Sequence, residues 1–241
     1  LGASRGYAAR RAAAFLVAVN CTEPAATCFC VSAGGGPRAD SGFDLVFTEL
    51  GPDAPGGDGA SPRYLVASGS DAGTAVLDAL PTEPADPTTV AWAVDAVAAA
   101  QNRMGRALPE ADPRQLLAET LTATHWEDVA ARCLTCGNCT LVCPTCFCTS
   151  VTDTTDLTGE HSQRWQRWAS CFETDFSYLH GGAVRSSAGS RYRQWLTHKL
   201  GTWHDQFGES GCVGCGRCVA WCPVGIDITA EMAALAQGGT S

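Results

Sequence analysis

The chain has 241 residues, of which 45% are hydrophobic, and it carries a formal net charge of −9. It is long enough for one large domain or two small ones. Its acidic balance argues against nucleic-acid binding, which rests on basic surface. The longest apolar stretch, residues 12–19, is too short to span a membrane. The first residue is Leu1 rather than methionine, so we expect that residues upstream of it are missing from this sequence.

The first part of the chain reads as a mixture of strands and helix. Residues 12–20 are predicted to form a buried strand, because they are continuously apolar up to the final asparagine. Two further strands are predicted at residues 43–50 and 63–68, and a short helix at residues 72–80. We therefore predict a small strand-rich α+β domain over residues 1–87.

The second part, residues 88–241, is predicted to be a mainly helical domain. Apolar residues such as Val90, Val94 and Val97 recur at helical spacing within residues 88–108. A second helix is predicted to begin at Pro113, with Asp112 as its N-cap, and a third to span residues 126–132. These three helices lead directly into a cysteine-rich segment.

Fourteen cysteines are a high number for a chain of this length. In a secreted protein they would indicate disulfides, but no signal peptide is recognisable. Thiolates that bind metal are typical of a reducing compartment, so we expect the protein in the cytoplasm.

Eight of the cysteines form two runs with the same spacing, C-x2-C-x2-C-x3-C-P, at residues 133–144 and 212–223. Such a run holds cubane iron–sulfur clusters in bacterial two-cluster ferredoxins, where the fourth cysteine of one run ligates the cluster of the other. The spacing therefore predicts two [4Fe–4S] clusters. The ligands of the first are Cys133, Cys136, Cys139 and Cys222, and those of the second are Cys212, Cys215, Cys218 and Cys143.

A zinc-stabilised structural scaffold is the alternative from another functional class. Structural zinc usually takes two CxxC pairs, whereas each run here has four cysteines and a proline. The sequence contains no glycine-rich nucleotide fingerprint, no HExxH-like histidine grouping and no nucleophile triad, so we assign no catalytic residue. We predict a protein that carries electrons and does not itself perform bond chemistry.

Three further cysteines, Cys21, Cys28 and Cys30, lie within ten residues of one another. Their proximity predicts a third [4Fe–4S] cluster. Its fourth ligand would come from upstream of Leu1, from another segment or from a group other than cysteine. The alternative is a set of buried free thiols, because cysteine is among the residue types most often buried.

The last three cysteines are Cys146, Cys148 and Cys171. Cys146 and Cys148 follow Cys143 so closely that they either pack beside it or bind a metal together with Cys171. A disulfide between Cys146 and Cys148 is less favoured, because a bridge across one residue is strained.

The segment between the two cysteine runs, residues 144–211, is also predicted to be helical. Trp165, Trp168 and Phe172 are spaced as one apolar stripe, and a longer stripe extends over residues 192–207. We expect these aromatic side chains to cover the clusters. Because they would exclude water, they would also tune the reduction potentials of the clusters.

Many short motifs resemble those of the β subunit of cytoplasmic sulfhydrogenases, a family that also includes the corresponding iron–sulfur protein of anaerobic sulfite reductase. They span nearly the whole chain, at residues 21–24, 27–30, 43–45, 48–50, 143–148, 156–159, 175–178, 180–182 and 221–228. The family's upstream Pro-Cys-Asp motif is not found in this sequence.

The resemblance implies a helical ferredoxin-type C-terminal domain in a multisubunit oxidoreductase complex. One implied partner is a flavin subunit that exchanges electrons with NAD(P)H. The other is the small and large subunits of a [NiFe] hydrogenase or, in the sulfite enzyme, a sirohaem subunit. The chain is therefore expected to be an electron-transfer subunit.

Overall fold

A computed structural model describes residues 5–57 and 61–238, and its backbone divides into two compact units. The first unit consists of Leu1–Ala25 and Gly36–Met104, and the second of Ala26–Gly35 and Gly105–Ser241. This division differs from the predicted boundary at residue 87, because the helix that follows the boundary belongs with the sheet. In addition, a short segment from the N-terminal part belongs to the helical unit.

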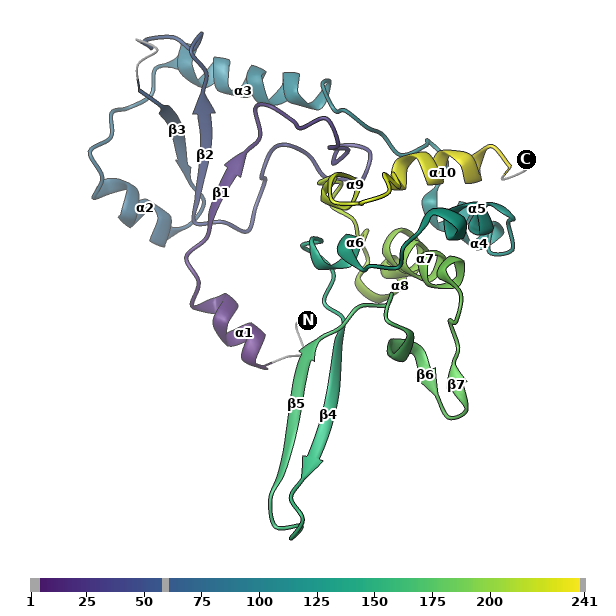
Figure 1. The fold of residues 1–241 in the computed structure, drawn as a ribbon. Helices are drawn as coiled ribbons and strands as arrows, with labels where there is room; N and C mark the ends of the chain where they lie inside the picture. The colour runs from purple at the N-terminus through teal and green to yellow at the C-terminus, as the bar shows by residue number, and fades with distance from the viewer. Residues whose placement is uncertain (1–4, 58–60, 239–241) are drawn as a thin grey trace. The chain divides into compact units, whose positions relative to one another are not determined.

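The first unit is built on a three-stranded sheet in the order β1-β2-β3 (Figure 1). Strand β1 (Val17–Asn20) runs parallel to β2, with Val17 opposite Leu45. Strand β2 (Leu45–Leu50) runs antiparallel to β3 (Arg63–Ser68), as an alternating pattern favours.

The strand predicted at residues 12–20 is only partly present. Residues up to Ala12 form helix α1 (Arg5–Ala12), and the strand begins at Val17. Val17 and Val19 are 53% and 66% exposed, so the strand is not buried as predicted. The reason is its position, because β1 is a strand of only four residues at the edge of the sheet.

Helix α3 (Pro87–Gln101) packs against β2 and β3, after the short helix α2 (Asp71–Asp78). Its N-cap Asp86 accepts hydrogen bonds from the N–H groups of Thr88 and Thr89, both at 2.9 Å. The helix ends well before residue 108, the end predicted from its periodicity. Its buried face carries Thr89, Ala93, Val97 and Ala100, whereas Val90 and Val94 are exposed. The apolar stripe was therefore misplaced, because small residues let the helix lie close to the sheet.

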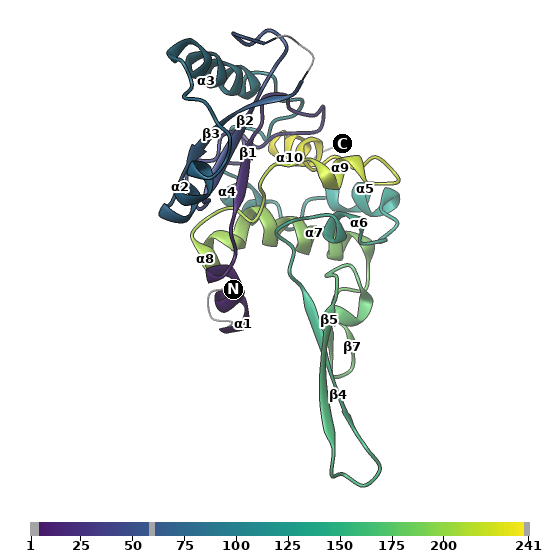
Figure 2. The ribbon, with the colours of Figure 1, turned by 90° about the vertical axis from the view of Figure 1, so that its left-hand side faces the viewer.

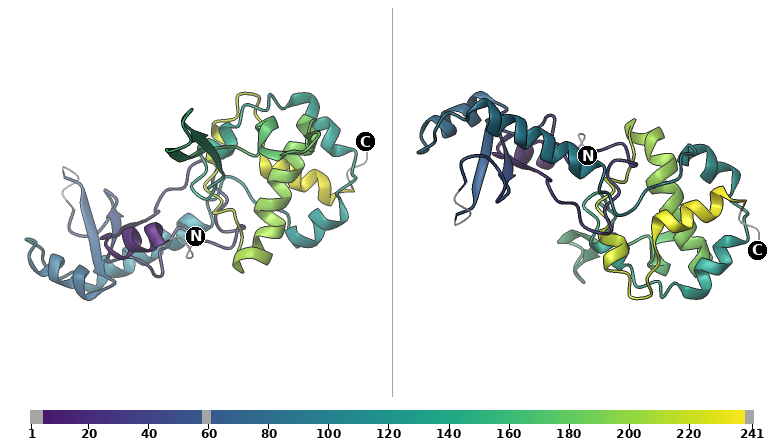
Figure 3. Two further views of the ribbon diagram at one scale, coloured as in Figure 1. Left: turned by 90° about the horizontal axis from the view of Figure 1, so that it is seen from below. Right: turned by 90° about the horizontal axis from the view of Figure 1, so that it is seen from above.

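The second unit is mainly helical, which confirms the predicted α+β class with helices in the C-terminal part. Asp112 caps α4 as predicted, accepting from the N–H of Arg114 at 2.8 Å. Leu117, Leu196 and Met232 are fully buried where the helices meet, and Figure 3 views these helices from two sides. The helices are α4 (Pro113–Glu119), α5 (His125–Arg132), α7 (Ala188–Thr197), the π-helical turn η2 (His198–Thr202), α8 (Trp203–Phe207) and α10 (Ile228–Ala236).

A β-hairpin stands where the sequence predicted a helix. Strands β4 (Thr149–Thr155) and β5 (Ser162–Trp168) pair antiparallel, with Thr149 opposite Trp168. The hairpin projects from the helices of its unit (Figures 1 and 2), and Trp165 and Trp168 are 60% and 70% exposed. The helical prediction for this part was wrong, because β4 is rich in threonine, which favours extended backbone over helix.

Shorter elements complete the second unit after the hairpin. The 3₁₀ turn η1 (Thr174–Ser177) is followed by the two-residue strands β6 (Tyr178–Leu179) and β7 (Gly182–Ala183). From Ala188 to Phe207 the chain is helical as predicted, but the run is interrupted by the π-helical turn.

A buried carboxylate joins α5 to α10. The side chain of Glu231 on α10 is only 5% exposed, and it accepts a hydrogen bond from Arg132 at 2.9 Å and contacts His125 Nε2 at 2.7 Å. Replacing Glu231 with glutamine removes the negative charge of the acceptor in these hydrogen bonds, while Arg132 stays charged. We expect Glu231→Gln to lower the free energy of unfolding by roughly 1–2 kcal/mol.

The measurement is thermal unfolding followed by circular dichroism, at equal iron content. The matched control is Glu127→Gln on the exposed side of α5, for which we expect a change within about 0.5 kcal/mol. Equal effects of the two substitutions would contradict a stabilising role for Glu231.

Candidate functional site

The two cysteine runs fold into the same local structure. After the second cysteine of each run, Gly137 and Gly216 adopt left-handed backbone, with φ of 75° and 66°. They begin the single-turn helices α6 (Asn138–Leu141) and α9 (Arg217–Ala220). Two residues earlier, Thr135 and Gly214 are also left-handed, with φ of 52° and 62°. The repeated spacing is thus matched by a repeated backbone conformation.

This backbone aims N–H groups at the cysteine sulfurs. The N–H of Thr135 donates to Cys133 Sγ at 3.4 Å, and the N–H of Gly214 donates to Cys212 Sγ at 3.4 Å. The N–H of Ile226 donates to Cys222 Sγ at 3.2 Å. Hydrogen bonds to sulfur stabilise the thiolate form, which is the form that binds iron.

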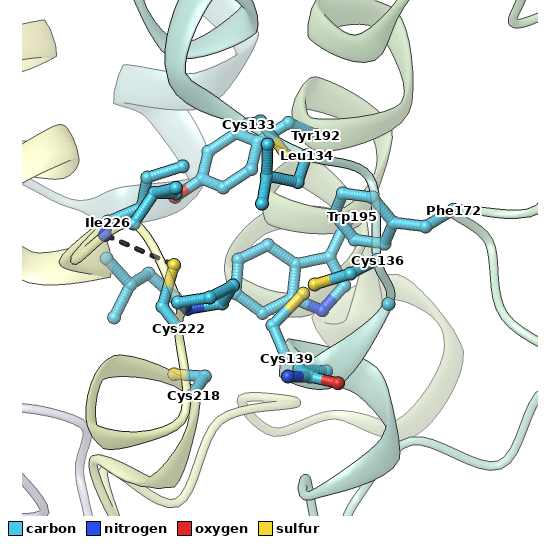
Figure 4. Close-up of a pocket in the computed structure, with 15 residues that line it drawn as sticks. Cys133, Leu134, Cys136, Cys139, Phe172, Tyr192, Trp195, Cys218, Cys222 and Ile226 are labelled. Atoms are coloured by element: carbon cyan, nitrogen blue, oxygen red, sulfur yellow. Dashed lines mark hydrogen bonds between the residues drawn. The ribbon is translucent and has the colours of Figure 1, made fainter.

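The first pocket is lined by Cys133, Cys136 and Cys139 of the first run and by Cys222 of the second. In Figure 4 the side chains of these cysteines surround the pocket together with the ring of Trp195. Cys218 also reaches the lining, and apolar side chains, including Phe172 and Ile226, complete it. The structure therefore brings together the four cysteines predicted for the first cluster.

The second pocket is lined by Cys212, Cys215 and Cys218 of the second run and by Cys143 of the first. These are the four cysteines predicted for the second cluster. Both pockets are lined by Trp195 as well as Cys218, so they are neighbours. The buried ring of Phe29 closes the second pocket.

Burial raises the pKa of lining thiols in both pockets, and Cys143 is the exception. In the first pocket, burial raises the pKa of Cys133 and Cys139. In the second pocket, burial raises the pKa of Cys212, and it raises the pKa of Cys218, which lines both pockets, to about 12. In contrast, a hydrogen bond from Cys146, helped by the Lys199 ammonium, lowers the pKa of Cys143 to about 4. Thiolates buried in this way require positive charge beside them, which iron supplies when it binds.

Two buried polar atoms in the first pocket also fit a bound cluster. Within the described residues, the hydroxyl of Tyr192 and the indole nitrogen of Trp195 have no hydrogen-bond partner. Both side chains line this pocket and are less than 5% exposed. A hydroxyl and an indole N–H are donors, and the sulfur atoms of a cluster are acceptors. The thiols and these donors together fit a [4Fe–4S] group.

Lys199 is a functional residue that the sequence prediction missed. It is 3% exposed, and its ammonium donates to Cys143 Sγ at 3.3 Å, Thr145 Oγ1 at 3.0 Å and the Gly211 carbonyl at 3.0 Å. Burial alone would lower the pKa of Lys199, but the negative charge of Cys143 and Cys146 raises it above its usual value. The one available signal was that this single lysine of the chain lies within the apolar stripe 192–207.

The cysteines predicted for a third cluster are divided between the two units. Cys21 belongs to the first unit, and Cys28 and Cys30 belong to the second. Within the second unit, Phe29 N–H donates to the Gly214 carbonyl at 2.8 Å, so this segment packs on the second cysteine run. The grouping of Cys21 with Cys28 and Cys30 remains a prediction from the sequence.

The other three cysteines lie beside the first run. Cys146 forms a hydrogen bond with Cys143, and Cys171 forms one with Cys148 at the base of the hairpin, lowering the pKa of Cys148 to about 7. No disulfide joins any of the fourteen cysteines, all of which lie within the described residues. Across residues 5–57 and 61–238, no group of three or more His, Cys, Asp or Glu side chains is arranged to hold a single metal ion. The ligands of a cubane each bind a different iron, so they need not converge on one point.

Comparison with known proteins agrees with this description. Residues 132–226 match the family described as the 4Fe-4S dicluster domain. The chain is 30% identical over 233 residues to sulfhydrogenase 2 subunit beta of Pyrococcus furiosus, an alignment that covers 92% of this chain and 63% of that protein. The chain thus spans less than two thirds of that relative. No solved structure matches it at a significant level.

These matches confirm the resemblance inferred from the short motifs. No helix within the described ranges is long and apolar enough to cross a membrane. Residues 132–226 therefore match a 4Fe-4S dicluster domain, which implies two [4Fe–4S] clusters, in a chain similar to the sulfhydrogenase 2 β subunit.

Proposed function

We propose that this chain relays single electrons between a flavin subunit that exchanges electrons with NAD(P)H and a [NiFe] hydrogenase module. The observation that carries the proposal is the pair of neighbouring pockets that share Trp195 and Cys218. Clusters in such pockets would be close enough to pass electrons to each other. The hydrogenase partner is supported by similarity to a protein named as a sulfhydrogenase subunit.

The proposed ligands are the two crossed sets of cysteines. Cys133, Cys136 and Cys139 would hold the first cluster with Cys222, and Cys212, Cys215 and Cys218 would hold the second with Cys143. When bound, each cluster supplies a site that accepts and releases one electron. The chain's own part is to hold the thiolates, donate N–H groups to their sulfurs and exclude water with aromatic side chains.

Relay in an anaerobic sulfite reductase is the second candidate, since the sequence motifs resemble both members of that family. The two candidates assign the same work to this chain and differ only in the enzyme with which it exchanges electrons. A third cluster involving Cys21, Cys28 and Cys30 would lengthen the relay.

The test is to purify the chain without oxygen from its own cells, together with its associated subunits, and to record the visible absorption of the clusters. We expect hydrogen gas to bleach this absorption and an oxidised nicotinamide nucleotide to restore it. Reoxidation by sulfite, without any response to hydrogen, would favour the sulfite reductase relay. Clusters that dithionite reduces but that respond to neither hydrogen, NAD(P)H nor sulfite would refute the relay proposal.

A further inference from the structure

Side chains on one helical face line both pockets. Tyr192, Trp195 and Lys199 follow one another at intervals of three and four residues along α7 and η2. Tyr192 lines the first pocket, Trp195 lines both and Lys199 lines the second. Lys199 lies in the π-helical turn, and such turns often occur at functional sites. The donors along this face therefore differ in kind from one pocket to the other.

The difference between the pockets is one of charge. The donors that line the first pocket, Tyr192 and Trp195, are neutral. The second pocket has the Lys199 ammonium, in direct contact with the sulfur of Cys143. Hydrogen bonds from an ionised donor are roughly twice as strong as those between neutral groups.

Another buried cation, Arg191, lies near Cys133, but its guanidinium is bound to oxygen atoms. It donates to the carbonyls of Arg185 and Ser186, both at 3.2 Å, and more weakly to Thr174 Oγ1. These carbonyls hold the Nη1 side of the guanidinium in place, whereas its buried Nε has no hydrogen-bond partner among the described residues. Arg191 is not among the residues that line the first pocket, so its charge acts on that pocket over a longer range than the charge of Lys199 acts on the second.

We propose that Lys199 makes the cluster held by Cys143, Cys212, Cys215 and Cys218 the more easily reduced of the two. An added electron makes a cluster more negative, and a buried cation at hydrogen-bond distance from a ligand sulfur stabilises that charge. An electron that enters the domain then occupies the second cluster in preference to the first. This inference depends on the proposed function, because it assumes that both clusters are redox-active.

Thr145 positions Lys199 for this task. The Thr145 hydroxyl accepts from the ammonium at 3.0 Å and donates to the Gly211 carbonyl at 2.6 Å. The ammonium also binds that carbonyl, so the three groups form a closed set in the buried interior. Because the ammonium is held on several sides, its charge acts from a fixed position.

The test is a redox titration of the purified full-length chain, with the two reduced clusters followed by electron paramagnetic resonance. We expect Lys199→Met and Lys199→Gln to lower the reduced-to-oxidised ratio of one cluster at a given potential by at least tenfold. For a one-electron couple this is a shift of about 59 mV. The other cluster should keep its potential. A Cys136→Ala background, which we expect to lack the first cluster, identifies the cluster that responds. In this background the potential of the second cluster should shift when Lys199 is replaced.

Two control variants separate charge from structure. Lys199→Arg keeps the charge and should stay close to the wild-type potential. Arg193→Met removes a positive charge from the same helix, where the guanidinium donates to the Leu121 carbonyl away from both pockets, and it should shift neither cluster. Iron content is measured in every variant, and if Lys199→Met loses iron, the glutamine variant provides the test.

Unchanged potentials in variants that retain their iron would overturn the proposal. So would a shift in Lys199→Arg as large as that in Lys199→Met, since the effect would then come from packing. Failure of the relay itself would appear separately, as wild-type clusters that do not respond to hydrogen or to a nicotinamide nucleotide.

Discussion

Replacing Cys139 and Cys222 together with alanine should remove about four irons per chain, the same number as replacing either cysteine alone. The two residues belong to different runs, yet they line the same pocket. If both ligate the first cluster, the second substitution has nothing further to remove. The measurement is iron and acid-labile sulfide on protein purified without oxygen.

The matched control combines two cysteines of one run. Cys139 and Cys143 are both in the first run but line different pockets, so Cys139→Ala with Cys143→Ala should remove about eight irons. If each run instead held a cluster with its own four cysteines, the two double variants would exchange their results. Loss of only about four irons, relative to the wild type, in the Cys139 and Cys143 double variant would therefore contradict the crossed ligands.

Gly216→Ala should destabilise the second unit by roughly 3 kcal/mol or more, because two penalties act together. Gly216 has φ of 66°, which side chains other than glycine rarely adopt. An added Cβ would also collide with the carbonyl oxygen of Thr27, in the segment that packs on the second run. We expect the variant to lose iron from the second pocket as well, because Gly216 lines that pocket.

Gly225→Ala is the control for this substitution. Gly225 has φ of 69°, but an added Cβ would meet no atom within 4 Å. Only the backbone penalty remains, so we expect a loss of about 1 kcal/mol and a full iron content. Thermal unfolding at equal protein concentration measures both variants. Similar losses in the two would show that the Thr27 segment does not pack against Gly216 as described.

The three cysteines that each run places around one pocket could be predicted from spacing, because a short run has few ways to place its side chains around a small site. The same holds for the cap of α4, where Asp112 and Pro113 are local signals that need no distant partner. Strand β3 was likewise predicted with its observed bounds, residues 63–68. These features depend on neighbours in the sequence. The fourth cysteine of each pocket, which comes from the other run, was predicted from the known pattern of two-cluster ferredoxins.

Other features depend on distant parts of the chain and were missed. Trp165 and Trp168 have helical spacing, but pairing with residues 149–155 places them on an exposed strand. The role of Lys199 depends on Cys143 and Gly211, which the fold brings to it. Likewise, the close contact of Thr27 with Gly216 joins segments far apart in sequence, and no periodicity records it.

The central claim is that this chain carries two [4Fe–4S] clusters, and metal analysis of the wild-type protein tests it most directly. Iron, acid-labile sulfide and zinc are counted per chain on protein purified without oxygen. We expect about eight irons and eight sulfides from the dicluster domain, and about four more of each if Cys21, Cys28 and Cys30 hold a third cluster. Zinc without acid-labile sulfide would contradict the claim and would instead indicate a structural scaffold.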